Sequence, residues 1–308
     1  MKYYVGIDVG GTRLKAGLVD EKHKIHGERV VELTAADKTE EGMIAKLADV
    51  TRAVLDGKRP VVVGLGVAGL VHRWKGTVVT APNFPDWDHF RIKERLEAAI
   101  GLHVVVDNDA NCVITGEYLQ GAGAGHPDLL GITLGTGVGG ALILGGSLWH
   151  GANGMAGEFG HMTVDPNGPR CGCGNTGCLE MYAGRVGLAE LVRKRPVKGC
   201  DPDSTDVPAQ LLAAAEAGDT QAKDHFKTAG RALGRALGGV LNLLNLQTVC
   251  IAGGVAPAFV YMEDACRQEM RRVAFGAVCD DVQFVIARLG PNAGILGAAM
   301  QWMMMPHD

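Results

Sequence analysis

The chain has 308 residues, of which 47% are hydrophobic and 21% are charged, and its formal net charge is −4. At roughly 150 residues per domain, this length predicts two lobes of a globular protein. The slightly acidic charge gives no basic surface for a nucleic-acid backbone. The N-terminus starts as a strand rather than a signal peptide, and no run approaches about 18 apolar residues, so we expect a cytoplasmic protein without a membrane span.

The first half of the chain alternates strands with helices. Residues 3–20 predict a strand, a Gly-Gly turn and a second strand, and residues 129–146 repeat this arrangement. Between them we predict, in order, a helix around Glu41–Leu55, a buried strand in 61–69, a loop in 81–87, a helix over Ile92–Ala99 and a strand in 103–107. Such alternation predicts an α/β fold, and the repeat suggests a duplicated architecture.

The second half is expected to be richer in helices. In order, we predict a helix near Gly187–Arg195, two helical stretches in 211–244, a strand from Thr248 into a glycine turn, a helix, a strand in 282–289 and a last helix at about Asn292–Met303. We expect the chain to cross between lobes near Asp107–Thr115. The small lobe would then hold residues 1–112 plus 292–308, and the large lobe residues 113–291.

Two glycine turns are candidate phosphate sites. Glycines let successive backbone N–H groups approach an anion, and the sequences DVGGT and GTGVGG both suit that role. The second turn is followed by a strand rather than a helix, which excludes a dinucleotide fingerprint, and the chain has no P-loop motif. Each turn taken alone is also explained by an ordinary hairpin, so the inference depends on the pair.

Several residues around these turns are candidates for nucleotide binding. Asp8 is suited to hold a magnesium ion or its water, and Thr12 and Lys15 to meet phosphate oxygens. A third glycine corner after Ala252 would admit an adenine ring, or is simply a structural turn. The full candidate set is Asp8, Gly10, Gly11, Thr12, Lys15, Gly135, Thr136, Gly137, Gly253 and Gly254.

Asp109 is the candidate general base. It lies where the strand in 103–107 gives way to a helix, and a helix N-terminus favours a negative charge. An ionised aspartate can accept the proton of an alcohol while the oxygen attacks a phosphorus atom. The alternatives are a plain helix cap by Asp107 or Asn108, with Asp107 as a rival base.

The segment from Gly160 to Glu180 is a candidate metal site. It is too glycine-rich to be a helix, and its one nitrogen and three sulfur ligands suit a closed, structural tetrahedral zinc site. A disulfide is the alternative, although reduced thiols are expected in this compartment. The four candidate ligands are His161, Cys171, Cys173 and Cys178, and the other five cysteines show no ligand spacing.

Glu158 and Glu180 flank this segment. A carboxylate can accept hydrogen bonds from two neighbouring hydroxyls of a sugar. Zinc would make the loop rigid and fix which imidazole nitrogen of His161 stays free to donate. We therefore interpret both glutamates as candidate sugar contacts, with solvated surface residues as the alternative.

The motifs together resemble one known family. The stretches DVGGTRLK, NDAN, LGTGVGG, GEFGH and CGCGNTGCLE occur in the order found in the ROK family of repressors, open reading frames and kinases. The resemblance spans nearly the whole chain. The histidine-to-cysteine spacing is its most specific part, whereas the glycine turns are shared with other actin-like and sugar-kinase folds.

The resemblance implies an α/β, two-lobed, actin-like ATPase fold of the ribonuclease H-like type, with a mixed sheet and flanking helices in each lobe and a ligand cleft between the lobes. It also implies ATP, Mg²⁺ and structural Zn²⁺ as cofactors, a hexose as substrate, and a homodimer. By motif, Asp109 matches the catalytic base, and the four zinc ligands match those named above. The residues that match sugar contacts are Asn83, Asn108, Asp109, Glu158, His161 and Glu180. For Asn83, a turn asparagine before Phe84-Pro85 is the alternative.

Two departures from the family pattern concern the sugar end. Gly184 stands where the family often has a serine, and GVAG at 66–69 replaces a common G-x-P-G. Family members phosphorylate glucose, N-acetylglucosamine, N-acetylmannosamine, allose or fructose with the same polar set. Glucose phosphorylation at the 6-hydroxyl is therefore the expected activity, with N-acetylglucosamine or N-acetylmannosamine kinase as the alternative.

Two functions of other classes compete with the kinase. A sugar-responsive repressor would need a DNA-binding module, and because only seven residues precede Asp8 we expect no such module there. A sugar sensor that binds without phosphoryl transfer is the second alternative, although the candidate base is intact.

Overall fold

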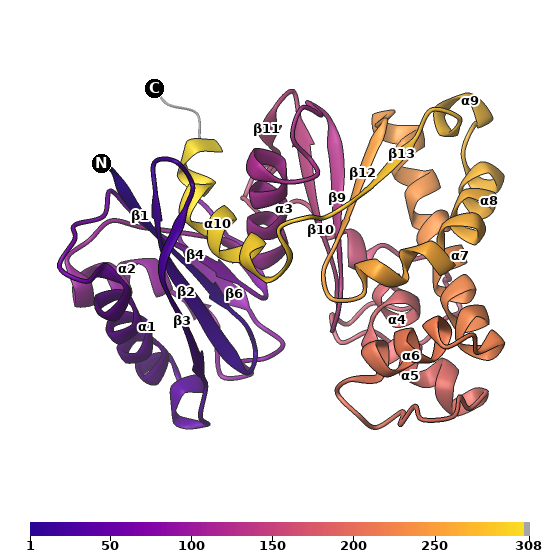
Figure 1. The fold of residues 1–308 in the computed structure, drawn as a ribbon, viewed down its shortest axis with the longest axis horizontal. Helices are drawn as coiled ribbons and strands as arrows, with labels where there is room; N and C mark the ends of the chain where they lie inside the picture. Colours follow the sequence, from indigo (N-terminus) through magenta and orange to yellow (C-terminus); the bar gives the residue numbers. More distant parts are fainter. Residues whose placement is uncertain (305–308) are drawn as a thin grey trace. The chain divides into compact units, whose positions relative to one another are not determined.

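A computed structural model describes residues 1–304, which form two compact units (Figure 1). Of the described residues, unit 1 contains Met1–Pro127, Ala141–Gly157 and 288–304, and unit 2 contains Asp128–Gly140 and Glu158–Ala287. The sequence places the boundaries near residues 112 and 292 instead. The whole of the helix that follows Asn108 lies in unit 1 because it packs against the last helix of the chain.

The central sheet of unit 1 is mixed and has the strand order β3-β2-β1-β4-β8. β1, β2 and β3 are antiparallel neighbours, whereas β1, β4 and β8 run parallel. These strands span Tyr3–Val9 (β1), Arg13–Asp20 (β2), Ile25–Glu32 (β3), Val63–Val67 (β4) and Val104–Asn108 (β8). A small antiparallel sheet joins β5 (Leu70–His72), β6 (Thr77–Thr80) and β7 (Asp88–Phe90).

Helices cover both faces of the central sheet of unit 1. Apolar residues of β1, β2, β4 and β8 pack on one face with Met43 and Leu47 of α1 (Glu40–Leu55) and Ile92 of α2 (Ile92–Ile100). On the other face, Ile295 and Ala299 of α10 (Ala293–Met300) form a second apolar cluster. α3 (Asp109–Gln120) packs against α10, which ends in a 3-10 turn over Gln301–Met304.

Glycines let α10 lie directly on the sheet. A Cβ atom on Gly6 of β1 would overlap with the carbonyl oxygen of Ile295, and one on Gly64 of β4 would overlap with that of Ala298. Because glycine has no Cβ, the helix backbone approaches the strand backbone closely. This packing places the start of α10 beside the end of β1.

The second five-stranded sheet has the order β11-β10-β9-β12-β13. β10 and β11 are antiparallel, whereas β12 runs parallel to both β9 and β13. The strands span Leu129–Leu134 (β9), Val138–Leu144 (β10), Ser147–Leu148 (β11), Thr248–Ala252 (β12) and Gln283–Ile286 (β13), and the division between the units falls within β10. The strand order follows the same plan as in the first sheet, in agreement with the duplicated architecture suggested by the sequence.

Unit 2 contains the remaining helices. The 25-residue helix α7 packs against α8, and the side chain of Asp219 caps its N-terminus by accepting from Ala222 N at 2.8 Å. The helices span Glu180–Ala183 (α4), Arg185–Lys194 (α5), Val207–Glu216 (α6), Thr220–Leu244 (α7), Glu263–Val273 (α8) and Gly276–Cys279 (α9). Among residues 1–304, no helix combines the length and the apolar character needed to cross a membrane.

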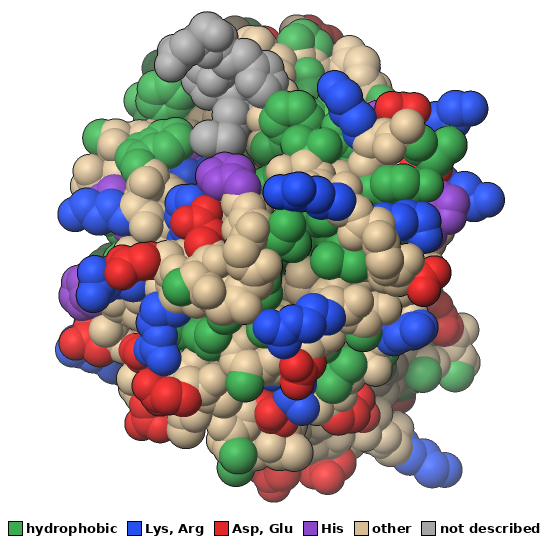
Figure 2. All heavy atoms as spheres, turned by 90° about the vertical axis from the view of Figure 1, so that its left-hand side faces the viewer, with side chains coloured by type: hydrophobic (Ala, Val, Ile, Leu, Met, Phe, Trp, Pro, Cys, Tyr) green, Lys and Arg blue, Asp and Glu red, His purple; other side chains and the backbone are tan. Residues whose placement is uncertain are grey.

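Lys and Arg side chains are interspersed with Asp and Glu on the face drawn in Figure 2. The near-balance of charge in the sequence thus also appears on this surface.

Candidate functional site

Asp8 lies next to the end of β1, opposite Lys15 of β2. Burial raises the pKa of the Asp8 carboxyl, and the charges of Lys15 and Arg13 oppose this shift only in part. The start of α10 crowds the carboxyl, since a Cβ on Gly294 would lie 3.0 Å from its Cγ. A carboxylate with a pKa raised by burial is stabilised by a nearby cation.

The first glycine turn closes the hairpin between β1 and β2. Gly10 N donates to Arg13 O at 3.1 Å, so the hairpin alternative is correct for the local structure. Asn83 lies against this turn, because a Cβ on Gly11 would be 2.6 Å from the Asn83 Cγ. The structure therefore places Asn83 and the first glycine turn together in unit 1, with Thr12 exposed beside them.

Asn108 is the N-cap of α3, which confirms one of the two caps that the sequence suggested. Its Oδ1 accepts from Ala110 N at 2.8 Å and from Asn111 N at 3.3 Å, and its Nδ2 donates to Gly69 O at 3.0 Å. An amide nitrogen carries two hydrogens, so one donor is left for a ligand.

Asp107 and Asp109 differ sharply in their surroundings. Asp109, the first residue of α3, is half-buried. Asp107 is 0% exposed, and both its oxygens accept hydrogen bonds, Oδ1 from Asn108 N and Asn111 Nδ2 and Oδ2 from His150. A carboxylate enclosed in this way is not available to a substrate hydroxyl, which argues against Asp107 as a rival base.

The second glycine turn lies between β9 and β10 and contacts Glu180. A Cβ on Gly137 would overlap with the Glu180 Oε2 atom, which accepts a hydrogen bond from Val138 N at 3.0 Å. Arg185 N donates to Thr136 O at 3.1 Å, which ties the turn to α5. A predicted sugar contact and the predicted phosphate turn are thus neighbours within unit 2.

The four candidate zinc ligands gather in unit 2. One donor atom from each of His161, Cys171, Cys173 and Cys178 lies within 4.8 Å of the others. The Cys173 and Cys178 sulfurs are 3.6 Å apart, and the Cys171 sulfur is 3.7 Å from His161 Nδ1. A tetrahedral ion with Zn–S bonds of about 2.3 Å requires sulfur–sulfur distances of about 3.8 Å. The spacing therefore fits zinc, and it is far from the disulfide alternative, whose sulfurs would be about 2.05 Å apart.

The loop that carries these ligands depends on glycine. Gly174 and Gly177 have φ of 93° and 68°, in the left-handed region that favours this residue. Cys171 N donates to Asn175 O at 2.8 Å, and an isolated bridge pairs Thr163 with Cys178. Cys171 and Cys178 are buried and Cys173 is exposed, so one side of the donor set faces solvent.

Glu158 lies beside His161. Their closest atoms are Oε2 and Nε2, 3.9 Å apart, while Nδ1 of His161 faces the cysteines. Partial desolvation raises the pKa of Glu158, the positive charge of a protonated His161 lowers it, and the charge of Glu180 raises it further. Glu158, His161 and Glu180 therefore influence one another electrostatically within unit 2.

The third glycine corner follows β12. Gly253 has φ of 91°, and a Cβ there would overlap with Leu134 O, so this glycine is required by the backbone. No heavy atom lies within 4 Å of the Cβ position of Gly254. The structural-turn alternative explains Gly253, and open space beside Gly254 is compatible with a flat ring.

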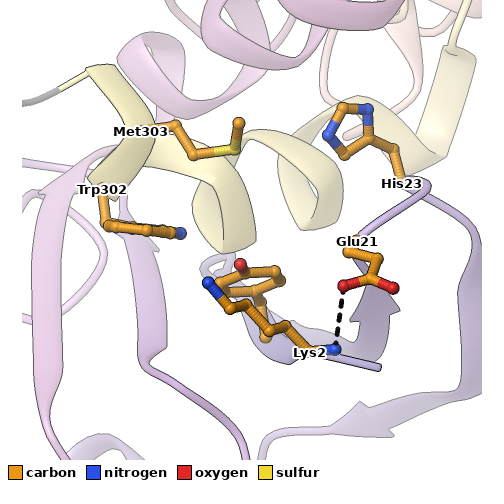
Figure 3. A pocket seen from close by; sticks show the side chains of 6 residues that line it. Lys2, Glu21, His23, Trp302 and Met303 are labelled. Atoms are coloured by element: carbon orange, nitrogen blue, oxygen red, sulfur yellow. Dashed lines mark hydrogen bonds between the residues drawn. The ribbon is translucent and has the colours of Figure 1, made fainter.

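A hollow of about 380 Å³ in unit 1 involves different residues (Figure 3). Its lining comes partly from the beginning of the sequence and partly from the 3-10 turn after α10. The stacked rings of Tyr4 and Trp302 have their centroids 5.6 Å apart. It is lined by Lys2, Tyr4, Glu21, His23, Trp302 and Met303. None of the residues predicted for nucleotide, sugar or metal binding lines it.

Sequence reasoning missed two buried residues beside the candidate base. Arg73 lies 3.2 Å from Asp107 through its Nε atom, and His150 lies 2.7 Å from the same carboxylate oxygen. Neither residue belongs to a motif recognised in the sequence. The strong burial of these two polar side chains, visible only in the folded chain, is the signal that reveals them.

The chain belongs to the ROK family, whose model matches residues 4–304. It is 36% identical to the glucokinase of Streptomyces coelicolor over 96% of both chains, and 34% identical to that of Thermotoga maritima over 96% of this chain and 95% of the relative. Among solved structures, it is similar to a ROK family glucokinase from Streptomyces griseus in complex with glucose and AMPPNP. The TM-score is 0.83 and the identity 36%, over 97% of this chain and 98% of that one. These likenesses confirm the predicted two-lobed α/β fold and a glucokinase-like sugar kinase.

Proposed function

We propose that the protein transfers the γ-phosphoryl group of ATP to the 6-hydroxyl of a hexose, and that the hexose is glucose. The observation that carries the proposal is the grouping of Glu158, His161 and Glu180 against the cysteine cluster, in a chain similar over its full length to glucokinases. Carboxylates and an imidazole held rigidly in one place are suited to accept and donate hydrogen bonds to sugar hydroxyls.

The proposed base is Asp109. At the first position of α3 its negative charge is stabilised by the helix N-terminus. It accepts the proton of the 6-hydroxyl as that oxygen attacks the γ-phosphorus. The proposal assigns the proton of the 6-hydroxyl to this carboxylate, sugar contacts to Glu158, His161 and Glu180, and further contacts to Asn83 and the second amide hydrogen of Asn108.

The nucleotide is proposed to bind at the glycine turns. Backbone N–H groups of the turns at Gly10–Thr12 and Gly135–Gly137 would hold phosphate oxygens, and Gly254 would lie against the adenine. Lys15 supplies a positive charge beside the first turn. Magnesium, when bound with ATP, neutralises phosphate charge, and Asp8, whose pKa is raised by burial, is the residue suited to hold it or its water.

The cysteine cluster is proposed to hold a structural zinc ion. Its ligands would be Nδ1 of His161 and the sulfurs of Cys171, Cys173 and Cys178. Bound zinc supplies rigidity to a loop without regular secondary structure. Coordination through Nδ1 leaves Nε2 of His161 on the side of Glu158, where it would donate to a sugar hydroxyl.

The position of Gly184 justifies testing sugars besides glucose. A Cβ there would lie 2.8 Å from Glu180 O and 3.2 Å from Glu180 Cγ, so the departure from the family serine lies directly on a proposed sugar contact. A glycine leaves Glu180 more room to move toward or away from a substituent. N-acetylglucosamine and N-acetylmannosamine are therefore the alternative substrates.

A coupled assay of ADP release tests the proposal. The purified protein with magnesium ATP is measured against glucose, mannose, fructose, allose, N-acetylglucosamine and N-acetylmannosamine. We expect the highest kcat/KM with glucose. A higher value with an N-acetylhexosamine would reassign the substrate, and sugar binding without ADP release would make the protein a sensor. Light scattering of the same sample tests the homodimer that the family resemblance implies.

A further inference from the structure

A buried ionic cluster lies beneath the candidate base in unit 1. It consists of Arg73, Asp107 and His150, which are 5%, 0% and 7% exposed. Buried polar and charged groups are costly unless they are paired, so two such side chains around one buried carboxylate require an explanation. None of them is available to take a substrate proton, which leaves a role exerted through their neighbours.

One side of the cluster holds the residues that begin α3. Oδ1 of Asp107 accepts from Asn108 N at 2.8 Å and from Asn111 Nδ2 at 2.7 Å. Asn108 is the N-cap, Asp109 is the first helical residue, and Asn111 lies in the first turn. The Asp107 carboxylate therefore holds the backbone N–H of Asn108 before Asp109 and the side chain of Asn111 after it.

Arg73 anchors that carboxylate to the sheet. Its Nε lies 3.2 Å from Asp107 Oδ2, while its Nη1 donates to Val106 O at 2.7 Å and to Gln301 Oε1 at 2.6 Å. Gln301 in turn donates to Leu65 O of β4 at 3.1 Å. The guanidinium is thus held directly by the backbone of β8 and, through Gln301, by that of β4, so its positive charge has a fixed position beside Asp107.

The other side of the cluster holds the loop that leads to Glu158. Nε2 of His150 bonds Oδ2 of Asp107 at 2.7 Å, and its backbone carbonyl accepts from Ala156 N at 3.0 Å. Trp74, next to Arg73, donates to Ala152 O at 3.1 Å and packs edge-on against the His150 ring at 5.3 Å. A Cβ on Gly154 would collide with Arg73. Residues 150–156 are therefore folded onto this cluster, just before Glu158.

We propose that Asp107, together with Arg73 and His150, is a positioning site that sets the Asp109 carboxylate and the loop entering Glu158 from one buried point. The inference rests on the proposed sugar kinase function. The site has two arms, the contact of Asp107 with Asn111 and its contact with His150, and each positions a different segment. The contact with Asn111 holds only the start of α3, whereas the contact with His150 also holds residues 150–156, the loop that leads to Glu158.

The effects of the two arms are distinguished by measuring kcat and KM with the hexose of the panel that has the highest kcat/KM. His150→Leu removes the donor to Asp107 at similar volume, and we expect kcat to fall about 10- to 100-fold with a raised hexose KM. His150→Gln keeps an N–H donor and is expected to recover most of both values. Asn111→Ala is expected to lower kcat while the hexose KM stays within twofold. For all variants the ATP KM is expected to change less than twofold.

His225→Leu is the matched control. His225 is also buried and makes one hydrogen bond of 2.7 Å, to Arg195 O at the end of α5, outside the candidate sites. We expect it to lower the Tm as His150→Leu does but to keep wild-type kcat and hexose KM. Such a difference distinguishes positioning from a general loss of stability.

The outcomes separate the two proposals. If the wild type is active and both His150→Leu and Asn111→Ala keep kcat within twofold, the positioning site is refuted and the kinase stands. Equal kinetic losses in His225→Leu, or no recovery in His150→Gln, also refute it. If His150→Leu does not fold, Asn111→Ala decides alone. A wild type that phosphorylates no sugar of the panel refutes the kinase, and the positioning site with it.

Discussion

Nε2 of His161 lies 3.9 Å from Oε2 of Glu158, on the opposite side of the ring from the cysteines. One imidazole therefore faces a metal site with one nitrogen and a candidate sugar carboxylate with the other. The orientation of the His161 ring is set by the stronger of two interactions, with the metal site or with Glu158. A bound zinc ion would fix the ring and, through it, the environment of Glu158.

Replacing Cys171 or Cys178 with serine is expected to release zinc, raise the hexose KM and lower the Tm, because the loop loses the ion that holds it. Metal content is measured by atomic absorption on the purified variants. Cys200→Ser is the control, since Cys200 is a free cysteine outside the cluster and should leave one zinc per chain. Negligible zinc in the wild type would contradict the metal site itself.

Asp109→Asn is expected to retain hexose binding and to lose turnover by about 10²- to 10⁴-fold, because a neutral amide cannot accept the hydroxyl proton. Binding is measured by calorimetry and turnover by ADP release. Asp88→Asn, at an exposed position of β7, is the control and should match the wild type. Turnover preserved in Asp109→Asn would place the base elsewhere.

Asp20 is expected to make stability depend on acid pH. The hydrogen bond with His26 and the backbone N–H groups of Lys24 and Lys22 lower the pKa of Asp20 to about 2 in the folded chain. The pKa of an aspartate in an unfolded chain is about 3.9. The stabilisation by Asp20 is therefore complete above that pH and is lost as the pH falls toward 2. Urea unfolding of Asp20→Asn should show a deficit at pH 6 that shrinks below pH 4. A deficit that is constant from pH 6 to pH 3 would contradict this cause.

Gly6→Ala is expected to destabilise the protein by about 1–3 kcal/mol, because its methyl group would force α10 away from β1. The ATP KM should also rise, since α10 begins against Asp8 through Gly294. Gly276→Ala is the control, because no heavy atom lies within 4 Å of the Cβ position of Gly276. Urea midpoints that are equal for the two variants would show that the close helix contact is not needed.

Local patterns predicted the elements with strong periodicity. The helices expected around Glu41–Leu55 and Ile92–Ala99 are α1 and α2, within one residue at each end. β3 was not predicted because it is an edge strand with mostly exposed or half-buried residues, so it has little apolar alternation. β5, β6 and β7 are only three or four residues long, too short for a periodic signal.

Part of the candidate site was likewise predictable from local sequence and part was not. The cysteine cluster was predictable because its ligands lie within 18 residues, from His161 to Cys178, and their types match zinc chemistry. The contact of His150 with Asp107 joins residues 43 positions apart and depends on how distant strands pack. No local pattern encodes that contact, and only the folded chain shows it.

Unit 1 joins β1, near the start of the sequence, to α10, which follows almost 300 residues later, and this order has a consequence for biosynthesis. The face of β1, β2, β4 and β8 that α10 covers is complete only when α10 itself has left the ribosome. Until then, apolar residues such as Val19 and Val105 remain exposed on a growing polypeptide. Chaperone engagement is therefore expected to last at least until α10 has been synthesised and to centre on the first five-stranded sheet.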